Sequence, residues 1–135
     1  MNKENSLGIG LLIFRLNLGI LMLFHGIYKL INGVDGIKGM LANYGIPEFL
    51  AYGVHLGETV AAIMMIVGFR TKLASFVYTF VMVVAFLMAH TQNFFEFGKS
   101  GAWAHEGIAL FLFGGLGLMF TGGGKYSVST NHKWD

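Results

Sequence analysis

The chain has 135 residues, of which 55% are hydrophobic and only 12% charged, and its formal net charge is +2. Soluble domains usually carry about 25% charged residues, so this composition excludes an ordinary soluble globular domain. The absence of cysteine excludes disulfides, iron–sulfur clusters and thiolate zinc sites, and no basic cluster indicates a nucleic-acid partner. The length predicts one domain spanning residues 1–135.

Four apolar stretches are long enough to cross a bilayer as helices, which takes about 20 residues each. They cover residues 8–30, 49–69, 73–91 and 103–121, approximately. Helices satisfy their backbone hydrogen bonds internally, as the hydrocarbon core requires, and the sequence lacks the alternating ten-residue strands of a membrane barrel. We therefore expect an all-α, transmembrane four-helix bundle in contact with the lipid bilayer.

The connection between the first two spans has a pattern of its own. Val34, Ile37, Leu41 and Tyr44 recur at helical spacing. Such a segment predicts a short interfacial helix lying along the outer surface of the membrane. Pro47 follows it near the start of the second span, where a missing N–H costs little.

Lysine and arginine in the short loops predict the orientation, because cytoplasmic loops carry an excess of these residues. One side holds five of them and the other side two, with Lys29 at its edge. The five are Lys3, Arg70, Lys72, Lys125 and Lys133, and the two are Lys38 and Lys99. We therefore expect both termini in the cytoplasm and a location in the bacterial inner (cytoplasmic) membrane.

Ionisable side chains inside a membrane are costly and mark candidate functional positions. Every span of this chain contains or borders at least one. The candidates are Arg15, His25, Lys29, His55, Glu58, His90, His105 and Glu106. The three on the first span share one helix face, and so do the two on the second.

Depths along straight helices place the four histidines within one layer about 6 Å thick near the outer face. Glu106 falls in the same layer and Lys29 lies just above it. Arg15 and Glu58 lie deeper, and an arginine side chain can span the difference between them. Pairing would spare both charges from isolation in hydrocarbon, so the depths predict an Arg15–Glu58 ion pair.

A layer of imidazoles and carboxylates suits proton exchange with a bound ring, since histidine donates and accepts protons near neutral pH. An apolar pocket with a few convergent polar groups is the usual form of a quinone site. His25, His55 and Glu58 are the candidate catalytic residues. The candidate ligand-binding residues are Arg15, Lys29, His90, His105 and Glu106.

Other interpretations stay open. Imidazole and carboxylate also bind metals, and two histidines are enough to hold a haem, although too few carboxylates share the layer for a di-iron centre. His90 and His105 lie near span ends, where contact with water alone accounts for them. Lys29 can extend to the headgroups, and an Arg15–Glu58 pair can simply lock the bundle.

The order and spacing of these residues resemble the DoxX family from about residue 12 to 127. The first span matches the opening pattern of the family, and later matches follow at the loop, the second span and the glycine-rich exit. The matching residues are Arg15, Gly19, His25, Gly26, Lys29, Gly45, Pro47, Glu58, Gly68, Phe69, Arg70, His90, Glu106, Gly124, Tyr126 and Ser127. Ser129 departs from the pattern, where an acidic residue is expected.

The resemblance implies a four-helix membrane protein linked to respiratory or redox complexes, and the family takes its name from a subunit of a thiosulfate:quinone oxidoreductase. We therefore expect a quinone-type ligand near the outer face. The alternative is a non-catalytic accessory or assembly subunit of a larger respiratory complex, or a homo-oligomer, because a bundle of this size has little room for an electron-transfer chain. A small transporter is a third class, disfavoured because inverted repeats and broken helices are not evident.

Overall fold

A computed structural model describes residues 2–135, and in this part of the chain all regular secondary structure is helical apart from one isolated bridge between Phe97 and Trp103. In chain order the elements are α1 (Lys3–Asn32), α2 (Asp35–Asn43), the 3-10 helix η1 (Glu48–Gly53), the π-helical turn η2 (Leu56–Ala61), α3 (Ala62–Val67), α4 (Thr71–Ala89) and α5 (Glu106–Thr121). The segment Glu48–Val67 is one apolar rod, named here the second span. The predicted all-α membrane bundle with a short helix between its first two spans is confirmed.

The helix ends differ from the apolar stretches by a few residues. α1 begins earlier than residue 8 because the Asn2 side chain accepts a hydrogen bond from the Asn5 amide at 2.9 Å and caps the helix. α1, the second span and α4 are long and apolar enough to cross a membrane. α5 is apolar but has 16 residues, which gives about 24 Å of helix against a hydrocarbon core of about 30 Å.

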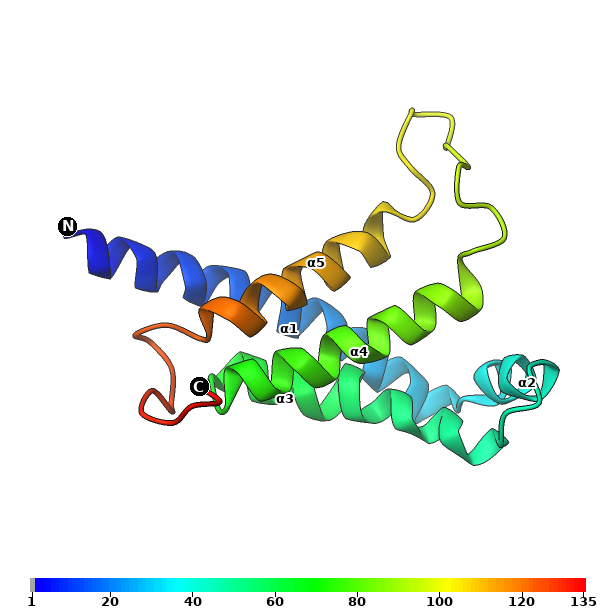
Figure 1. Cartoon of the computed structure of the whole chain (residues 1–135), viewed down its shortest axis with the longest axis horizontal. Helices are drawn as coiled ribbons and strands as arrows, with labels where there is room; N and C mark the ends of the chain where they lie inside the picture. The colour runs from blue at the N-terminus through cyan, green and yellow to red at the C-terminus, as the bar shows by residue number, and fades with distance from the viewer. Residues whose placement is uncertain (1) are drawn as a thin grey trace.

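Both chain ends lie at one end of the bundle, which we call the base (Figure 1). α4 packs against α5 and against η2, and α1 crosses the second span along η2 and α3. α2 and the connection from residue 90 to 105 extend from the opposite end, which we call the far end (Figure 1). The structure is therefore a bundle in which α4 lies between the second span and α5.

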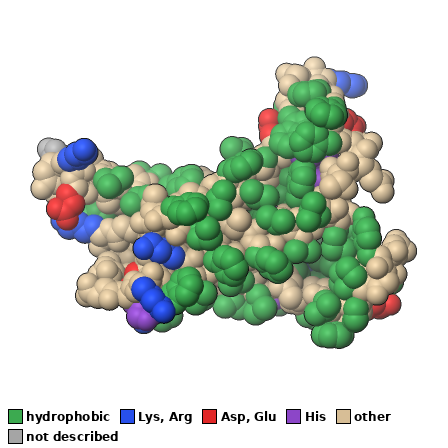
Figure 2. All heavy atoms as spheres, viewed as in Figure 1, with side chains coloured by type: hydrophobic (Ala, Val, Ile, Leu, Met, Phe, Trp, Pro, Cys, Tyr) green, Lys and Arg blue, Asp and Glu red, His purple; other side chains and the backbone are tan. Residues whose placement is uncertain are grey.

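The surface carries a broad apolar belt. Figure 2 shows hydrophobic side chains across the middle of the visible face, with charged side chains gathered toward the two ends. Large apolar side chains stand out of the fold along this belt, among them Phe24, Leu110 and Phe120, each more than 60% exposed. Such a continuous apolar surface is covered by lipid rather than water in a membrane protein.

Close contact between helices depends on glycine. A Cβ at Gly26 would overlap the carbonyl oxygen of Glu58, and a Cβ at Gly57 would lie 2.6 Å from the Cβ of Val81. These contacts put Gly26 of α1, Glu58 of the second span and Val81 of α4 at one depth. Since Glu58 lies about halfway along Glu48–Val67, that depth is the middle of the second span.

Replacement of Gly26 by alanine should therefore destabilise the bundle by about 1–3 kcal/mol, the usual cost of overpacking. Gly10→Ala is the matched control, because Gly10 lies on the same helix and its Cβ would meet nothing within 4 Å. Thermal unfolding in mild detergent measures both variants. Equal unfolding temperatures for the two variants would contradict the close contact at Gly26.

Candidate functional site

The middle of the bundle contains an ion pair between the Lys29 ammonium and the Glu58 carboxylate. The Glu58 side chain is 6% exposed and that of Lys29 is 24% exposed. Glu58 belongs to the π-helical turn η2, and single π-helical turns occur frequently at functional sites. The sequence signals this pair only as two ionisable residues in apolar surroundings.

The predicted Arg15–Glu58 pair is wrong. Arg15 lies beside Gly68 at the base, whereas Glu58 lies beside Gly26, and Arg15 and Gly26 are eleven residues or about 16 Å apart along α1. Lys29 occupies the same face of α1 as Arg15, four turns further along, and it takes the place that Arg15 was expected to fill. The depths drawn from the span ends were in error because hydropathy does not fix the register between two helices.

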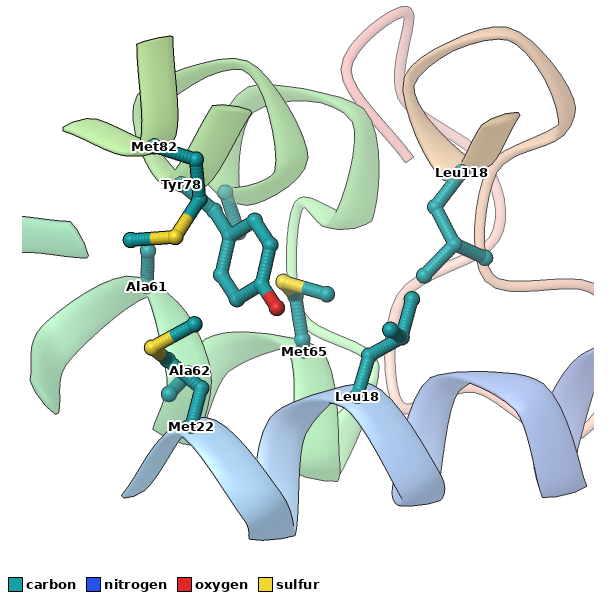
Figure 3. Packing of buried hydrophobic residues seen from close by; sticks show 9 residues of the cluster. Leu18, Met22, Ala61, Ala62, Met65, Tyr78, Met82 and Leu118 are labelled. Atoms are coloured by element: carbon teal, nitrogen blue, oxygen red, sulfur yellow. The ribbon is translucent and has the colours of Figure 1, made fainter. Parts of the chain in front are cut away.

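Two buried polar atoms on residues next to Glu58 in the second span, His55 Nδ1 and Thr59 Oγ1, have no hydrogen-bond partner among residues 2–135, and neither does Tyr78 Oη of α4. Tyr78 comes from α4 and directs its hydroxyl into the space between α1 and α3, beside Met65 (Figure 3). A buried polar group without a partner costs about 1–3 kcal/mol. The surroundings of Glu58 therefore offer hydrogen-bonding capacity to water or to a bound molecule.

His25 lies one helical turn from Lys29 and is exposed on the outside of the bundle. Its ring meets Phe111 of α5 edge-on, with 5.9 Å between ring centroids. His55 lies three residues before Glu58 and is half-buried. A series of four side chains thus runs from the lipid-facing surface to the interior, halfway along the second span: His25, Lys29, Glu58 and His55. We call this series the central site.

His90 and His105 form a separate pair at the far end, with their Nδ1 atoms 3.1 Å apart. His105 Nε2 lies 3.0 Å from the carbonyl oxygen of Asn93. Because a carbonyl only accepts, Nε2 of His105 carries a proton, and in its neutral form its Nδ1 then accepts from the Nδ1–H of His90. Glu106 begins α5 and is exposed, where a negative charge favours the helix N-terminus.

Arg15 clamps the base of the bundle. It is 1% exposed, and its Nη1 and Nη2 donate to Ser127 Oγ at 2.9 Å and to the Tyr126 carbonyl at 2.8 Å. Gly68 adopts a φ of 75°, and a side chain there would overlap the guanidinium. The chain from Tyr126 onward therefore completes the surroundings of Arg15, which sequence reasoning missed because the partners lie more than 100 residues away.

Two hollows lie outside the central site. One, of about 530 Å³, opens at the base, and the other, of about 630 Å³, follows the loop from Thr91 to Glu96. The base cavity is lined in part by Lys72, Gly123 and Asp135. In the part of the chain that the structure describes, no three of the His, Asp and Glu side chains come together as metal ligands.

The Lys29–Glu58 pair should behave as a buried pair. Glu58→Ala should lower the free energy of unfolding by about 3 kcal/mol or more, because it leaves the ammonium without a partner in hydrocarbon. The double variant Lys29→Met/Glu58→Met should regain most of that loss. Asp35→Ala is the control, since the Asp35 side chain of the 3.1 Å Lys38–Asp35 pair is 89% exposed and surface pairs contribute about 0–1 kcal/mol. Thermal unfolding of the four proteins gives the comparison.

The His90–His105 pair should make the far end sensitive to acid. Burial and the nearby His105 lower the pKa of His90 below its usual value. Between that lowered pKa and about 6.5, the folded state binds fewer protons than the unfolded state, so stability falls as the pH falls through this window. Measured by hydrogen–deuterium exchange and divided by the intrinsic exchange rate at each pH, the protection of amides across residues 91–104 should be lower at pH 5 than at pH 7.5. The same loss of protection in a His90→Phe variant would show another group to be responsible.

Comparison with known proteins agrees with this architecture. The family model described as DoxX matches residues 10–91, more than half of the chain. A Bacillus subtilis (strain 168) protein named "Putative oxidoreductase CatD" is 28% identical over 87 residues, which are 64% of this chain and 63% of that protein. The chain thus covers slightly less than two thirds of this relative, and no solved structure matches. The chain belongs to the DoxX family of membrane proteins.

Proposed function

We propose that this DoxX-family protein takes part in redox chemistry by binding a quinone-type ring at the central site. The observation that carries the proposal is the Lys29–Glu58 ion pair halfway along the second span, beside which His25 lies exposed on the outside of the bundle. Ionisable groups at this depth are costly and mark functional sites. The relative named as an oxidoreductase supports the redox class.

The chemistry of the central site suits such a ring. A quinone needs hydrogen-bond donors for its carbonyl oxygens and a source of protons when it is reduced. The imidazole of His25 and the ammonium of Lys29 supply donors, and Glu58 and His55 can exchange protons. A hydrocarbon-soluble ring would reach His25 from the bilayer, beside the Phe111 ring, without passing through water.

The other sequence candidates take different roles in this proposal. His90 and His105 hold the far-end loop through Asn93, and Glu106 begins α5. Arg15 is the buried charge that fastens the base. The predicted single layer of four histidines is thus divided between the central site, which we assign to the ligand, and the far end.

We further propose that the base faces the cytoplasm of a bacterium and that the protein lies in its inner membrane. The base carries five lysine and arginine residues at helix ends, in a loop or in the tail, and the far end two. Lys29 belongs to neither end, because it is paired with Glu58 in the middle of the bundle. The excess therefore supports cytoplasmic termini by the positive-inside rule.

The proposal is tested by thermal stabilisation of the purified protein with short-chain ubiquinone and menaquinone analogues. His25→Ala should weaken the apparent affinity about tenfold, as loss of one good hydrogen bond does. His132→Ala, an exposed histidine of the tail, should leave the affinity unchanged.

Three results would redirect the proposal. A Soret band that shifts on reduction would assign the histidines to haem. Metal bound to the purified protein, detected by elemental analysis, would assign the histidines to a metal site. Absence of any quinone effect together with co-purification of respiratory subunits in mild detergent would favour the accessory-subunit function.

A further inference from the structure

One face of α4 carries hydroxyl groups that lack partners. Thr71, Ser75 and Thr79 follow one another at four-residue spacing and are no more than 8% exposed. Their hydroxyl oxygens, and that of Tyr78, are buried and find no hydrogen-bond partner within residues 2–135. We call these four side chains the hydroxyl column.

Two other threonine hydroxyls of the chain do have partners. The hydroxyl of Thr91 donates to the carbonyl of Leu87 at 3.2 Å, and that of Thr121 donates to Gly117 at 3.1 Å. Each of these is the ordinary bond to the carbonyl four residues earlier. The hydroxyl column makes no such bonds, so its oxygens stay available inside the bundle.

The end of the column nearer the base is Thr71, which lies close to the base cavity. A Cβ on Gly123 would overlap both Thr71 Oγ1 and Ser127 Oγ. The two oxygens therefore face one another across Gly123 at a separation that one water molecule can bridge. Gly123 itself lines the base cavity of about 530 Å³, and Arg15 fixes Ser127 by its hydrogen bond of 2.9 Å.

The upper end of the column reaches the central site. Gly57 packs against Val81, so Glu58 lies at the depth of the last turn of the column. Tyr78 precedes Val81 by three residues, which is about 4.5 Å along α4. Thr71 and Tyr78 are separated by about 10 Å along α4, and Thr71, Ser75 and Thr79 follow one another at steps of about 6 Å, which is the length of two hydrogen bonds through one water.

We propose that the hydroxyl column lines a file of water molecules that joins the base cavity to Glu58 and carries protons to the Lys29–Glu58 pair. Buried waters occur where two to four polar partners converge, and the column supplies oxygens at each step. The positive charge of Arg15 beside the lower end repels metal cations, and Lys72 and Asp135 flank the mouth. The file is thus a route for water and single protons rather than an ion channel.

The part of this inference that concerns proton supply rests on the proposed function. When the oxygen of a bound ring that is already reduced to its anion takes one proton from the pair, the ring becomes neutral and Lys29 and Glu58 together carry one net negative charge, which is costly in hydrocarbon. The uppermost water then gives one proton to the pair, and a proton passed from the base restores that water. For each proton delivered to the ring, one proton is taken up at the base.

The test is radiolytic hydroxyl labelling of the ligand-free protein in detergent, read by mass spectrometry after millisecond mixing with ¹⁸O-water. Tyr78 has 0% exposure, yet a water file predicts that it is oxidised and that the added oxygen is ¹⁸O. Ser75→Ala should slow this labelling several-fold by removing one oxygen from the file. Thr121→Val, which removes a hydroxyl that already has a partner, should not change it.

The unfolding temperature of Ser75→Ala gives a second, independent measurement. If the Ser75 hydroxyl is dry, its removal relieves an unpaired polar group and the variant unfolds above the wild type. If the hydroxyl binds water, the variant unfolds at or below the wild type. Labelling of Tyr78 no faster than that of fully buried Leu118, or a raised unfolding temperature, would overturn the water file. Both measurements omit quinone, so failure of quinone binding leaves their outcome unaffected.

Discussion

The ion pair between Lys29 and Glu58 constrains the whole bundle, because two opposite charges in hydrocarbon are tolerable only in direct contact. Contact requires α1 and the second span to approach closely, and Gly26 permits this by leaving room for the Glu58 carbonyl. The π-helical turn at Leu56–Ala61 carries Glu58 at the same point. The register between the two helices is thus set by one charge pair and one glycine.

From this contact the remaining packing follows. α4 fits against η2 where Gly57 meets Val81, and α5 fits against α4 where Gly115 meets Tyr78 and Thr79. The half of the bundle nearer the base is then filled by an apolar core that includes Leu18, Met65, Tyr78 and Leu118 (Figure 3). Small residues bring the backbones together and large ones fill the space between them, as is usual in membrane helices.

Hydropathy predicted the spans to within a few residues, because the signal that a helix is apolar lies within the helix itself. The pairing of polar residues could not be predicted in this way. Arg15 and Lys29 occupy the same face of α1, and only the register against the second span decides which of them meets Glu58. The buried role of Thr71, Ser75 and Thr79 was also missed, since isolated hydroxyl residues are common in membrane helices and only the structure shows that theirs lack partners.

The clamp at Arg15 has a consequence for how the protein is made. Arg15 lies on the first helix, and its partner Ser127 follows 112 residues later. At about 5–20 residues per second, a ribosome needs on the order of ten seconds to reach that partner. During this interval α1 carries an arginine with no internal acceptor, so Arg15 must remain near the headgroups or the translocon. We therefore expect α1 to reach its final depth late in synthesis, when the residues around Ser127 arrive.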